Sequence, residues 1–179
     1  IVYTPDPTND NTPTLNWNAA SGAISYRVQL SSNASFTSII ADSIKTTTSV
    51  TINTPVADGM KYFRVASRDG LLNQSAFSIV DSFIVDTTPA TTPTVVIYAP
   101  DPTNDNTPTL DWISVVGAVK YRVQLSSNAS FTSIIADSIK TTLSVTINTP
   151  VSDGMKYFRV ASIDVSNNQS VFSTIDSFM

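Results

Sequence analysis

The chain contains the stretch VADGMKYFRVAS at Val56–Ser67, and again, with one change, VSDGMKYFRVAS at Val151–Ser162. Apolar and polar side chains alternate through both copies, so that Phe63 and Val65 would lie on one face and the intervening Tyr and Arg on the other. A period of two is typical of a half-buried β-strand. The Asp-Gly pair ahead of it signals a tight turn. The stretch therefore predicts a strand entered through a turn.

The same alternation recurs in the neighbouring runs, which are separated by turn signals near Gly22, Asn33 and Gly70. The expected inward-facing residues are Leu15 and Trp17 in TLNW, Tyr26, Val28 and Leu30 in YRVQL, Val50 and Ile52 in SVTIN, and Phe77 and Phe83 in AFSIVDSFIV. Helical periodicity is absent, and β-branched residues abound while Glu is missing. About seven short strands with this spacing predict an all-β antiparallel sandwich.

The sandwich is expected twice, because the chain is an internal repeat. Shifted by 95 positions, Pro5–Phe83 matches Pro100–Phe178 at about four positions in five. A unit of this size is too long for a solenoid repeat and suits a small complete domain. The connecting VDTTPATTP should be stiff and extended. We expect a first domain at residues 1–86, a Thr/Pro linker at 87–93 and a second domain at 94–179.

Both ends of the chain are in phase with the repeat. The opening IVYT resembles VIYA at Val96–Ala99, and the final DSFM stops where the first copy continues as DSFIVDTTP. The first residue is Ile rather than Met. We therefore expect a piece of a longer tandem array, whose partners are neighbouring repeats and other copies in a fibre or surface layer.

Trp17, SYRVQLS, VADGMKYFRVAS and DGLLNQSAFS follow one another in an order that resembles fibronectin type III-like and related Ig-like repeats of bacterial and archaeal surface proteins. The resemblance covers almost all of both copies. It implies a Trp on the second strand, a Tyr-x-Val on the third, and a D-x-x-x-N-x-S turn between the last two. The second copy departs from the pattern in that turn, where Val165 replaces Gly70.

Composition excludes several classes of function. The net charge is −4, and a nucleic-acid-binding domain needs a basic face to neutralise phosphates. The chain has no His and no Cys, so the commonest general base and thiolate chemistry are missing. No apolar run approaches the roughly 18 residues that span a bilayer. We expect no enzyme, no nucleic-acid partner and no direct membrane insertion.

The Pro-flanked cluster PDPTNDNTP, written at Pro5 and Pro100, has two interpretations. Asp and Asn brace their own turns through side-chain-to-backbone hydrogen bonds. Alternatively, their oxygens could bind Ca²⁺ together with an acid from a neighbouring turn or the linker, although the spacing is not that of an EF-hand. The candidate donors are Asp6, Asn9, Asp10, Asn11, Asp58 and Asp86 in the first copy, and Asp101, Asn104, Asp105, Asn106 and Asp153 in the second.

Ten of the sixteen differences between the copies fall in two stretches, Asn18–Ser25 and Arg68–Leu72. In a sandwich these loops share one pole, which faces the preceding domain of a head-to-tail array. In the second copy they supply four apolar residues: Ile113, Val115, Val116 and Ile163. These residues could form a docking patch, or the changes could be drift in permissive loops.

Four N-glycosylation sequons begin at Asn33, Asn73, Asn128 and Asn168, and could carry glycans in a host that attaches them. An outer face with Tyr62, Arg64 and Arg27 could bind sugar or form ordinary cross-strand pairs. We expect a secreted or surface-anchored prokaryotic protein in which these repeats act as a spacer or stalk. If the Asp/Asn cluster binds Ca²⁺ rather than only bracing its turn, the ion would stiffen the joints. The alternatives are an adhesive module that binds a glycan or protein, or an accessory domain of a polysaccharide-degrading enzyme.

Overall fold

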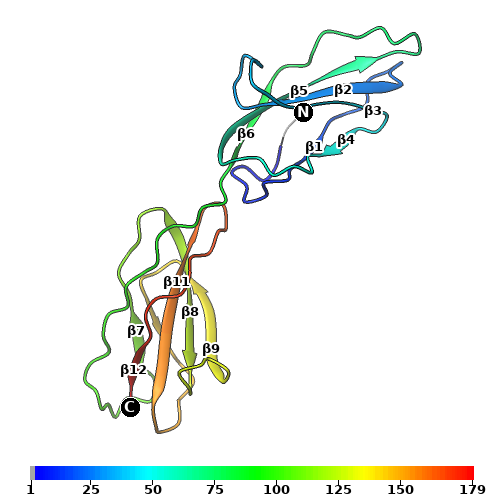
Figure 1. Ribbon diagram of the computed structural model, residues 1–179. Coiled ribbons are helices and arrows are strands. Elements are labelled where there is room, and N and C mark those ends of the chain that lie inside the picture. The colour runs from blue at the N-terminus through cyan, green and yellow to red at the C-terminus, as the bar shows by residue number, and fades with distance from the viewer. Residues whose placement is uncertain (1–2) are drawn as a thin grey trace. The chain divides into compact units, whose positions relative to one another are not determined.

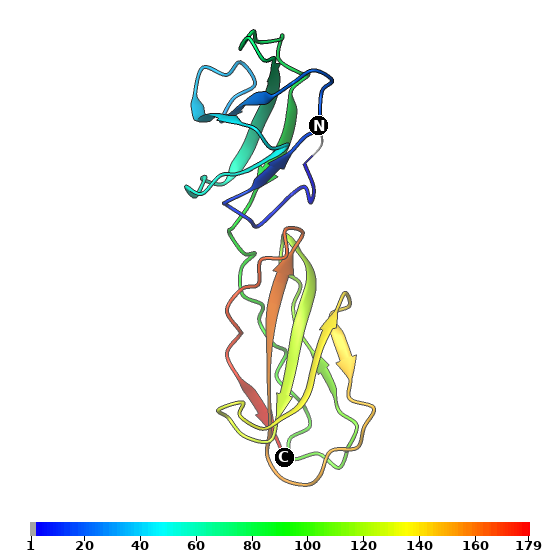
Figure 2. The same cartoon turned by 90° about the vertical axis from the view of Figure 1, so that its right-hand side faces the viewer.

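The computed structural model describes residues 3–179 and divides into two compact units, Ile1–Thr88 and Pro89–Met179 (Figure 1). The division falls inside the segment 87–93. Both units consist of antiparallel strands joined by turns and extended segments, as Figure 2 shows from the side. Nowhere in residues 3–179 is there a helix long and apolar enough to cross a membrane. The chain is all-β, as predicted.

The first unit contains a four-stranded and a two-stranded sheet. The larger sheet has the order β3-β2-β5-β6, formed by β2 (Ser25–Ser31), β3 (Ile39–Lys45), β5 (Gly59–Arg68) and β6 (Asp81–Val85). The smaller sheet pairs β1 (Thr14–Asn16) with β4 (Ser49–Thr51).

The second unit repeats this topology. Its larger sheet has the order β12-β11-β8-β9, formed by β8 (Ala118–Ser126), β9 (Ile134–Lys140), β11 (Lys156–Asp164) and β12 (Asp176–Phe178). Its smaller sheet pairs β7 (Thr109–Asp111) with β10 (Ser144–Thr146).

The inward face predicted from the alternation forms the core of each unit. Leu15 of the small sheet and Phe63 of the large sheet are fully enclosed in one cluster, to which Trp17 and Tyr26 also belong. The Trp17 and Tyr26 rings meet edge to face, with centroids 5.7 Å apart. The second unit has an equivalent cluster around Leu110 and Phe158. Burial of this apolar face is what holds the two sheets together.

The predicted final strand is shorter than expected. In AFSIVDSFIV only Asp81–Val85 forms a strand, and the preceding residues bond to β5 through backbone N–H groups and serine hydroxyls. The Ser78 hydroxyl accepts the Val65 N–H at 3.1 Å, where a strand would place a backbone carbonyl. The expectation that Phe77 points inward is wrong, because its ring packs on Arg64, which lies on the opposite face.

The turn after β5 is the same in both units despite the exchange of Gly70 for Val165. Asp69 accepts the Asn73 N–H at 2.9 Å, and Asp164 accepts the Asn168 N–H at 2.9 Å. The residues with left-handed backbone are Leu72 (φ 67°) and Asn167 (φ 65°). The glycine position therefore carries no conformational demand that Val165 would violate.

Strand register assigns the loops to two ends of each unit. Ser25 pairs with Arg68, so the loops before β2 and after β5 share one end. Gly59 pairs with Val85, and Val85 also bridges Thr8, so the Asp/Asn cluster meets the turn before β5 and the end of β6. We call this second end the Asp/Asn pole.

Candidate functional site

The Asp/Asn cluster of the first unit is joined to β6 by an isolated parallel bridge between Thr8 and Val85. The Thr8 N–H donates to the Ile84 carbonyl and the Asp86 N–H donates to the Thr8 carbonyl, each at 2.9 Å. The Asp6 carboxylate accepts the Ile84 N–H at 2.8 Å. Asp6 therefore fixes the end of β6 with a side chain where a neighbouring strand would use its backbone.

Asp10 and Asp105 brace their own turns. Each carboxylate accepts the amide and hydroxyl of the Thr two residues on, at 2.8 and 2.9 Å in the first unit and at 2.8 and 3.0 Å in the second. Asn11 and Asn106 contribute backbone carbonyls, which accept N–H groups of Val56 and Val151 at 2.8 Å. The turn-building interpretation predicts contacts of this kind.

Asp58 holds the beginning of the connecting segment. Its Oδ1 accepts the Thr87 N–H at 3.0 Å and the Thr87 hydroxyl at 2.7 Å, and its Oδ2 accepts the Thr88 hydroxyl at 2.7 Å. The Thr88 and Thr87 hydrogen bonds lower the pKa of Asp58. Asp86 accepts the Thr88 N–H at 3.1 Å. We call this group, Asp58 with Thr87 and Thr88, the linker clasp.

A buried lysine adds an internal cation to the turn that carries Asp58. Lys61 is only 4% exposed, and its ammonium donates to the carbonyls of Asp58 at 3.3 Å and Gly59 at 3.0 Å. Burial lowers the pKa of Lys61. Lys156 repeats the arrangement on the Gly154 carbonyl at 2.8 Å. Part of the negative charge at this pole is thus balanced from within the chain.

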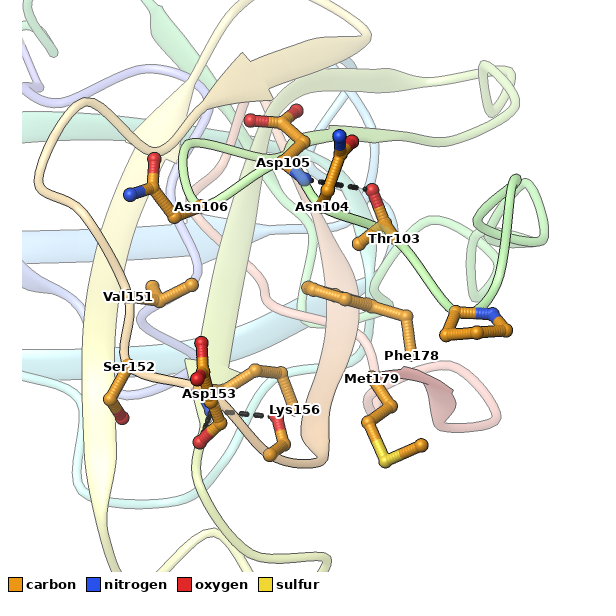
Figure 3. Close-up of a pocket in the computed structure, with 12 residues that line it drawn as sticks. Thr103, Asn104, Asp105, Asn106, Val151, Ser152, Asp153, Lys156, Phe178 and Met179 are labelled. Atoms are coloured by element: carbon orange, nitrogen blue, oxygen red, sulfur yellow. Dashed lines mark hydrogen bonds between the residues drawn. The ribbon is translucent and has the colours of Figure 1, made fainter.

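At the same pole of the second unit, the residues around Thr103 and the turn before β11 enclose a cavity of about 240 Å³ (Figure 3). Four of the five residues predicted there as calcium donors line it: Asn104, Asp105, Asn106 and Asp153. The fifth, Asp101, accepts the Met179 N–H at 2.9 Å. Across residues 3–179 no three acidic side chains gather as a metal-binding group. Calcium binding stays a prediction.

The other end of the connecting segment is bonded to the second unit. The Ser162 hydroxyl in β11 lies 2.8 Å from the carbonyl oxygen of Thr91 and 3.3 Å from that of Ala90. Thr87 and Thr88 are thus held within the first unit, and Ala90 and Thr91 within the second. Sequence reasoning found the linker but neither of the two groups that hold it.

The outer face of the large sheet carries a stack that the sequence did not reveal. The Arg64 guanidinium carbon lies 4.0 Å from the ring centroid of Phe36 and 4.1 Å from that of Phe77. Arg159 is held in the same way at 3.9 and 4.1 Å. Arg64 also donates from Nε to the Gln29 side-chain oxygen at 2.9 Å. Phe36 reaches the stack from a left-handed backbone, with φ 56°.

This stack bears on the predicted sugar-binding face. Two aromatic rings pack against the Arg64 guanidinium, and Arg27 donates from Nε to Asp42 at 2.9 Å. The hydrogen bond from Arg27 lowers the pKa of Asp42. Arg64 and Arg27 are therefore engaged in contacts within the first unit, and sugar binding at this face stays a prediction.

The sequon asparagines lie in turns, and their amide nitrogens already donate hydrogen bonds. Asn33 and Asn128 donate to the Thr hydroxyl four residues on, each at 2.9 Å. Asn73 and Asn168 donate to the Asp carboxylate four residues back, at 2.9 and 3.0 Å. An N-glycan would attach to the nitrogen that makes these bonds. Glycosylation stays a prediction.

The four residues of the predicted apolar patch differ in their surroundings. Asp164 pairs with Ala118, which places Ile163 at the same end of the unit as the loop before β8. Ile113 and Val116 are exposed, at 55% and 98%, whereas Val115 packs against the core of its own unit. Ile163 is buried. The docking role of the patch stays a prediction.

No protein-family model and no curated protein sequence matches the chain. Solved structures do. The FN1–FN3 domains of chicken CNTN1 match 96% of the chain with a TM-score of 0.64 at 11% identity, and the chain spans 61% of their length. The fibronectin(III)-like modules of Clostridium thermocellum CbhA match 97% of the chain and 88% of their own length, with a TM-score of 0.52 at 14% identity.

A biofilm-associated protein BSP domain matches 97% of the chain and 28% of its own length, at 15% identity and a TM-score of 0.37. The first two similarities show that the fold is fibronectin type III-like, as the order of residues around Trp17 implied.

Proposed function

We propose that these repeats are structural spacer modules of a prokaryotic surface or secreted protein, arranged in a tandem array that projects or assembles other parts. The observation that carries the proposal is the connecting segment. The linker clasp holds its first two residues on the first unit, and Ser162 holds its next part on the second.

A spacer must resist bending at each joint, and conformational freedom in the linker would defeat it. Pro89 lies between two hydrogen-bonded residues. The Thr88 hydroxyl donates to Asp58, and the Ala90 carbonyl accepts from the Ser162 hydroxyl. Proline restricts φ to a narrow range and offers no N–H of its own. We propose that the linker transmits orientation rather than acting as a flexible tether. Calcium at the joints would add to this stiffness but is not required by it.

We propose no catalytic role. The chain lacks His, so a Ser or Thr nucleophile has no imidazole base. The carboxylates of Asp10 and Asp69 accept hydrogen bonds from their own turns, and that of Asp58 accepts them from the linker. These contacts support a structural use of the acidic residues.

An accessory module beside a catalytic domain is the second candidate, favoured by the similarity to the CbhA fibronectin(III)-like modules. A sugar-binding adhesive face is less well supported, since Arg64 is stacked between two phenylalanines. The spacer and the adhesive module differ in whether the chain has a saturable ligand.

The spacer is tested by measuring how far one unit moves relative to the other in solution. The chain has no Cys, so spin labels can be attached to single cysteines introduced at exposed Ala34 and Ala129. We expect a narrow distance distribution by pulsed electron paramagnetic resonance. Asp58→Ala should broaden it, and the matched Asp153→Ala should not, because it is Asp58 that accepts the hydrogen bonds of Thr87 and Thr88.

The spacer proposal fails if the unaltered chain gives a distribution as broad as a variant whose residues 87–91 are replaced by Gly and Ser. It also fails if a glycan array identifies a saturable ligand whose binding is lost with Tyr62→Ala. If the distance distribution stays narrow in Asp58→Ala, the spacer proposal stands, but the linker clasp is not what makes the joint stiff.

A further inference from the structure

Lys61 occupies a position in β5 where the strand alternation predicts an apolar side chain. It lies two residues before Phe63, which faces the core, and it pairs with the buried Phe83 of β6. Its own exposure is only 4%. Burying an ammonium ion costs free energy that an apolar residue at the same position would not lose. The second unit makes the same choice, since Lys156 is 3% exposed and pairs with Phe178.

The Lys61 ammonium is surrounded by main-chain carbonyls of the turn that precedes it. It donates to the carbonyl oxygens of Asp58 at 3.3 Å, Gly59 at 3.0 Å and Met60 at 3.4 Å. These are three successive residues, and an ammonium has three N–H donors. Carbonyl dipoles that converge on one point repel one another unless a cation lies between them. The ammonium therefore matches this turn in both charge and number of donors.

A glycine lets the turn bring these carbonyls together. Gly59 has a left-handed backbone, with φ 106°, which a residue with a side chain rarely adopts. The second unit has the same geometry at Gly154, with φ 102°. There the Lys156 ammonium donates to the carbonyls of Gly154 at 2.8 Å and Asp153 at 3.4 Å. The chain thus builds the same lysine-filled turn twice.

Asp58 connects this turn to the linker clasp. Its carbonyl oxygen accepts from Lys61, and its carboxylate accepts from Thr87 and Thr88. The two groups of bonds are therefore joined through the backbone and side-chain torsions of a single residue. A shift of the Asp58 carbonyl would carry the carboxylate with it, and hydrogen bonds weaken steeply when their distance or angle leaves the favourable range.

We propose that Lys61 is a positioning residue for the linker clasp, in which its ammonium acts as an internal cation that fixes the Asp58 carbonyl and so aims the Asp58 carboxylate at Thr87 and Thr88. The apolar stem of Lys61 fills the core position, and the charge at its end serves the turn. The inference rests on the proposed function, because the linker clasp belongs to the joint that a spacer must stiffen.

The test compares Lys61→Met with the unaltered chain by hydrogen exchange of the Thr87 amide, followed by NMR. Met keeps an unbranched side chain in the core and removes the three donors. We expect the Thr87 amide to exchange about tenfold faster, because its bond to Asp58 is lost. Loss of a nearby positive charge would by itself lower the local hydroxide concentration and slow the exchange, so an acceleration reports opening of the linker clasp.

Lys156→Met is the matched control, since it makes the same change in the second unit and should leave exchange at Thr87 unaltered. The amides of β2, a central strand of the large sheet, report whether the first unit stays folded. We expect their protection to be the same in Lys61→Met and in the unaltered chain.

A second pair of variants separates charge from packing and decides the question even if Lys61→Met does not fold. The chain has no Cys, so Lys61→Cys introduces a single thiol, which is alkylated in the unfolded chain before refolding. Bromoethylamine adds an aminoethyl group and restores an ammonium at the end of the side chain. Bromopropane adds a neutral group of the same length. We expect only the aminoethyl form to regain the slow exchange of Thr87.

The proposal is overturned if Lys61→Met leaves exchange at Thr87 unchanged or slower, or if the propyl form protects Thr87 as well as the aminoethyl form does. It is also overturned if Lys156→Met accelerates exchange at Thr87 as much as Lys61→Met. All of these measurements concern the first unit alone. A broad distribution of distances between the spin labels would therefore refute the spacer and leave these results unchanged, so the two failures are distinguishable.

Discussion

Replacing Val85 with Ala tests whether the end of β6 is a core element or a loose terminus of the first unit. Val85 is 0% exposed and sits in the core cluster with Phe83. The substitution removes two methyl groups, whose transfer from water contributes about 0.8 kcal/mol each. Incomplete relaxation around the lost volume, at about 24 cal/mol per Å³, adds roughly 1 kcal/mol more.

We therefore expect Val85→Ala to lower the free energy of unfolding of the first unit by about 2–3 kcal/mol. For a unit of this size, that corresponds to a fall in Tm of about 10 °C or more. With Trp112→Phe, the fluorescence of Trp17 reports this unit alone during urea denaturation. The control is the same substitution with Trp17→Phe, in which Trp112 should report an unchanged second unit.

The reasoning is refuted by a loss below about 0.5 kcal/mol, which is what surface substitutions typically cost. Such a result would mean that Val85 contributes no core burial to the stability of the first unit. An equal loss in both units would contradict the division of the chain between Thr88 and Pro89.

Three further predictions concern the charged residues. Because hydrogen bonds lower the pKa of folded Asp58, the stabilisation from the linker clasp is present above the ordinary carboxyl pKa and is lost as the pH falls through the lowered value. The Thr87 amide resonance should therefore shift between pH 7 and about 2.5. Asp58→Asn should abolish that titration. Arg64→Lys should lower the free energy of unfolding of the first unit by about 1 kcal/mol in urea denaturation, because Lys cannot stack flat between two rings. An unchanged urea midpoint would show that the stack does not stabilise the unit. If Asp10 only braces its turn, the Tm in EDTA and in millimolar Ca²⁺ should agree, whereas a rise in Ca²⁺ that Asp10→Ala removes would establish the calcium site.

The strands that alternate cleanly could be predicted from the sequence. YRVQL and KYFRVAS place one side chain in two in the core, and the inward residues Val28 and Phe63 are buried as expected. The edge strand β3 was missed, because Ile39 and Ile40 are adjacent and both partly exposed, which breaks the alternation. At an edge, only one neighbouring strand constrains the side chains, so the pattern is weak.

The candidate sites were predictable only in part. The sequence located the Asp/Asn cluster and Asp58 at one pole, and the strand register brings them there. It could not reveal that the Asp58 carboxylate receives Thr87 and Thr88, because this contact depends on the path of the chain after β6. Phe36 was overlooked for a similar reason, since a single aromatic in a polar loop has no periodicity that identifies its partner.

What the sequence determined alone is the β class, the duplication, and the choice of inward residues, because these follow from local alternation and from self-similarity. What the tertiary structure decided is the residue at which a strand begins or ends within identical segments. GMKYF extends β5 back to Gly59, where Val85 pairs with it, whereas β11 begins at Lys156, which pairs with Phe178. A strand end is set by the partner that satisfies its backbone, and that partner is supplied by a distant part of the chain.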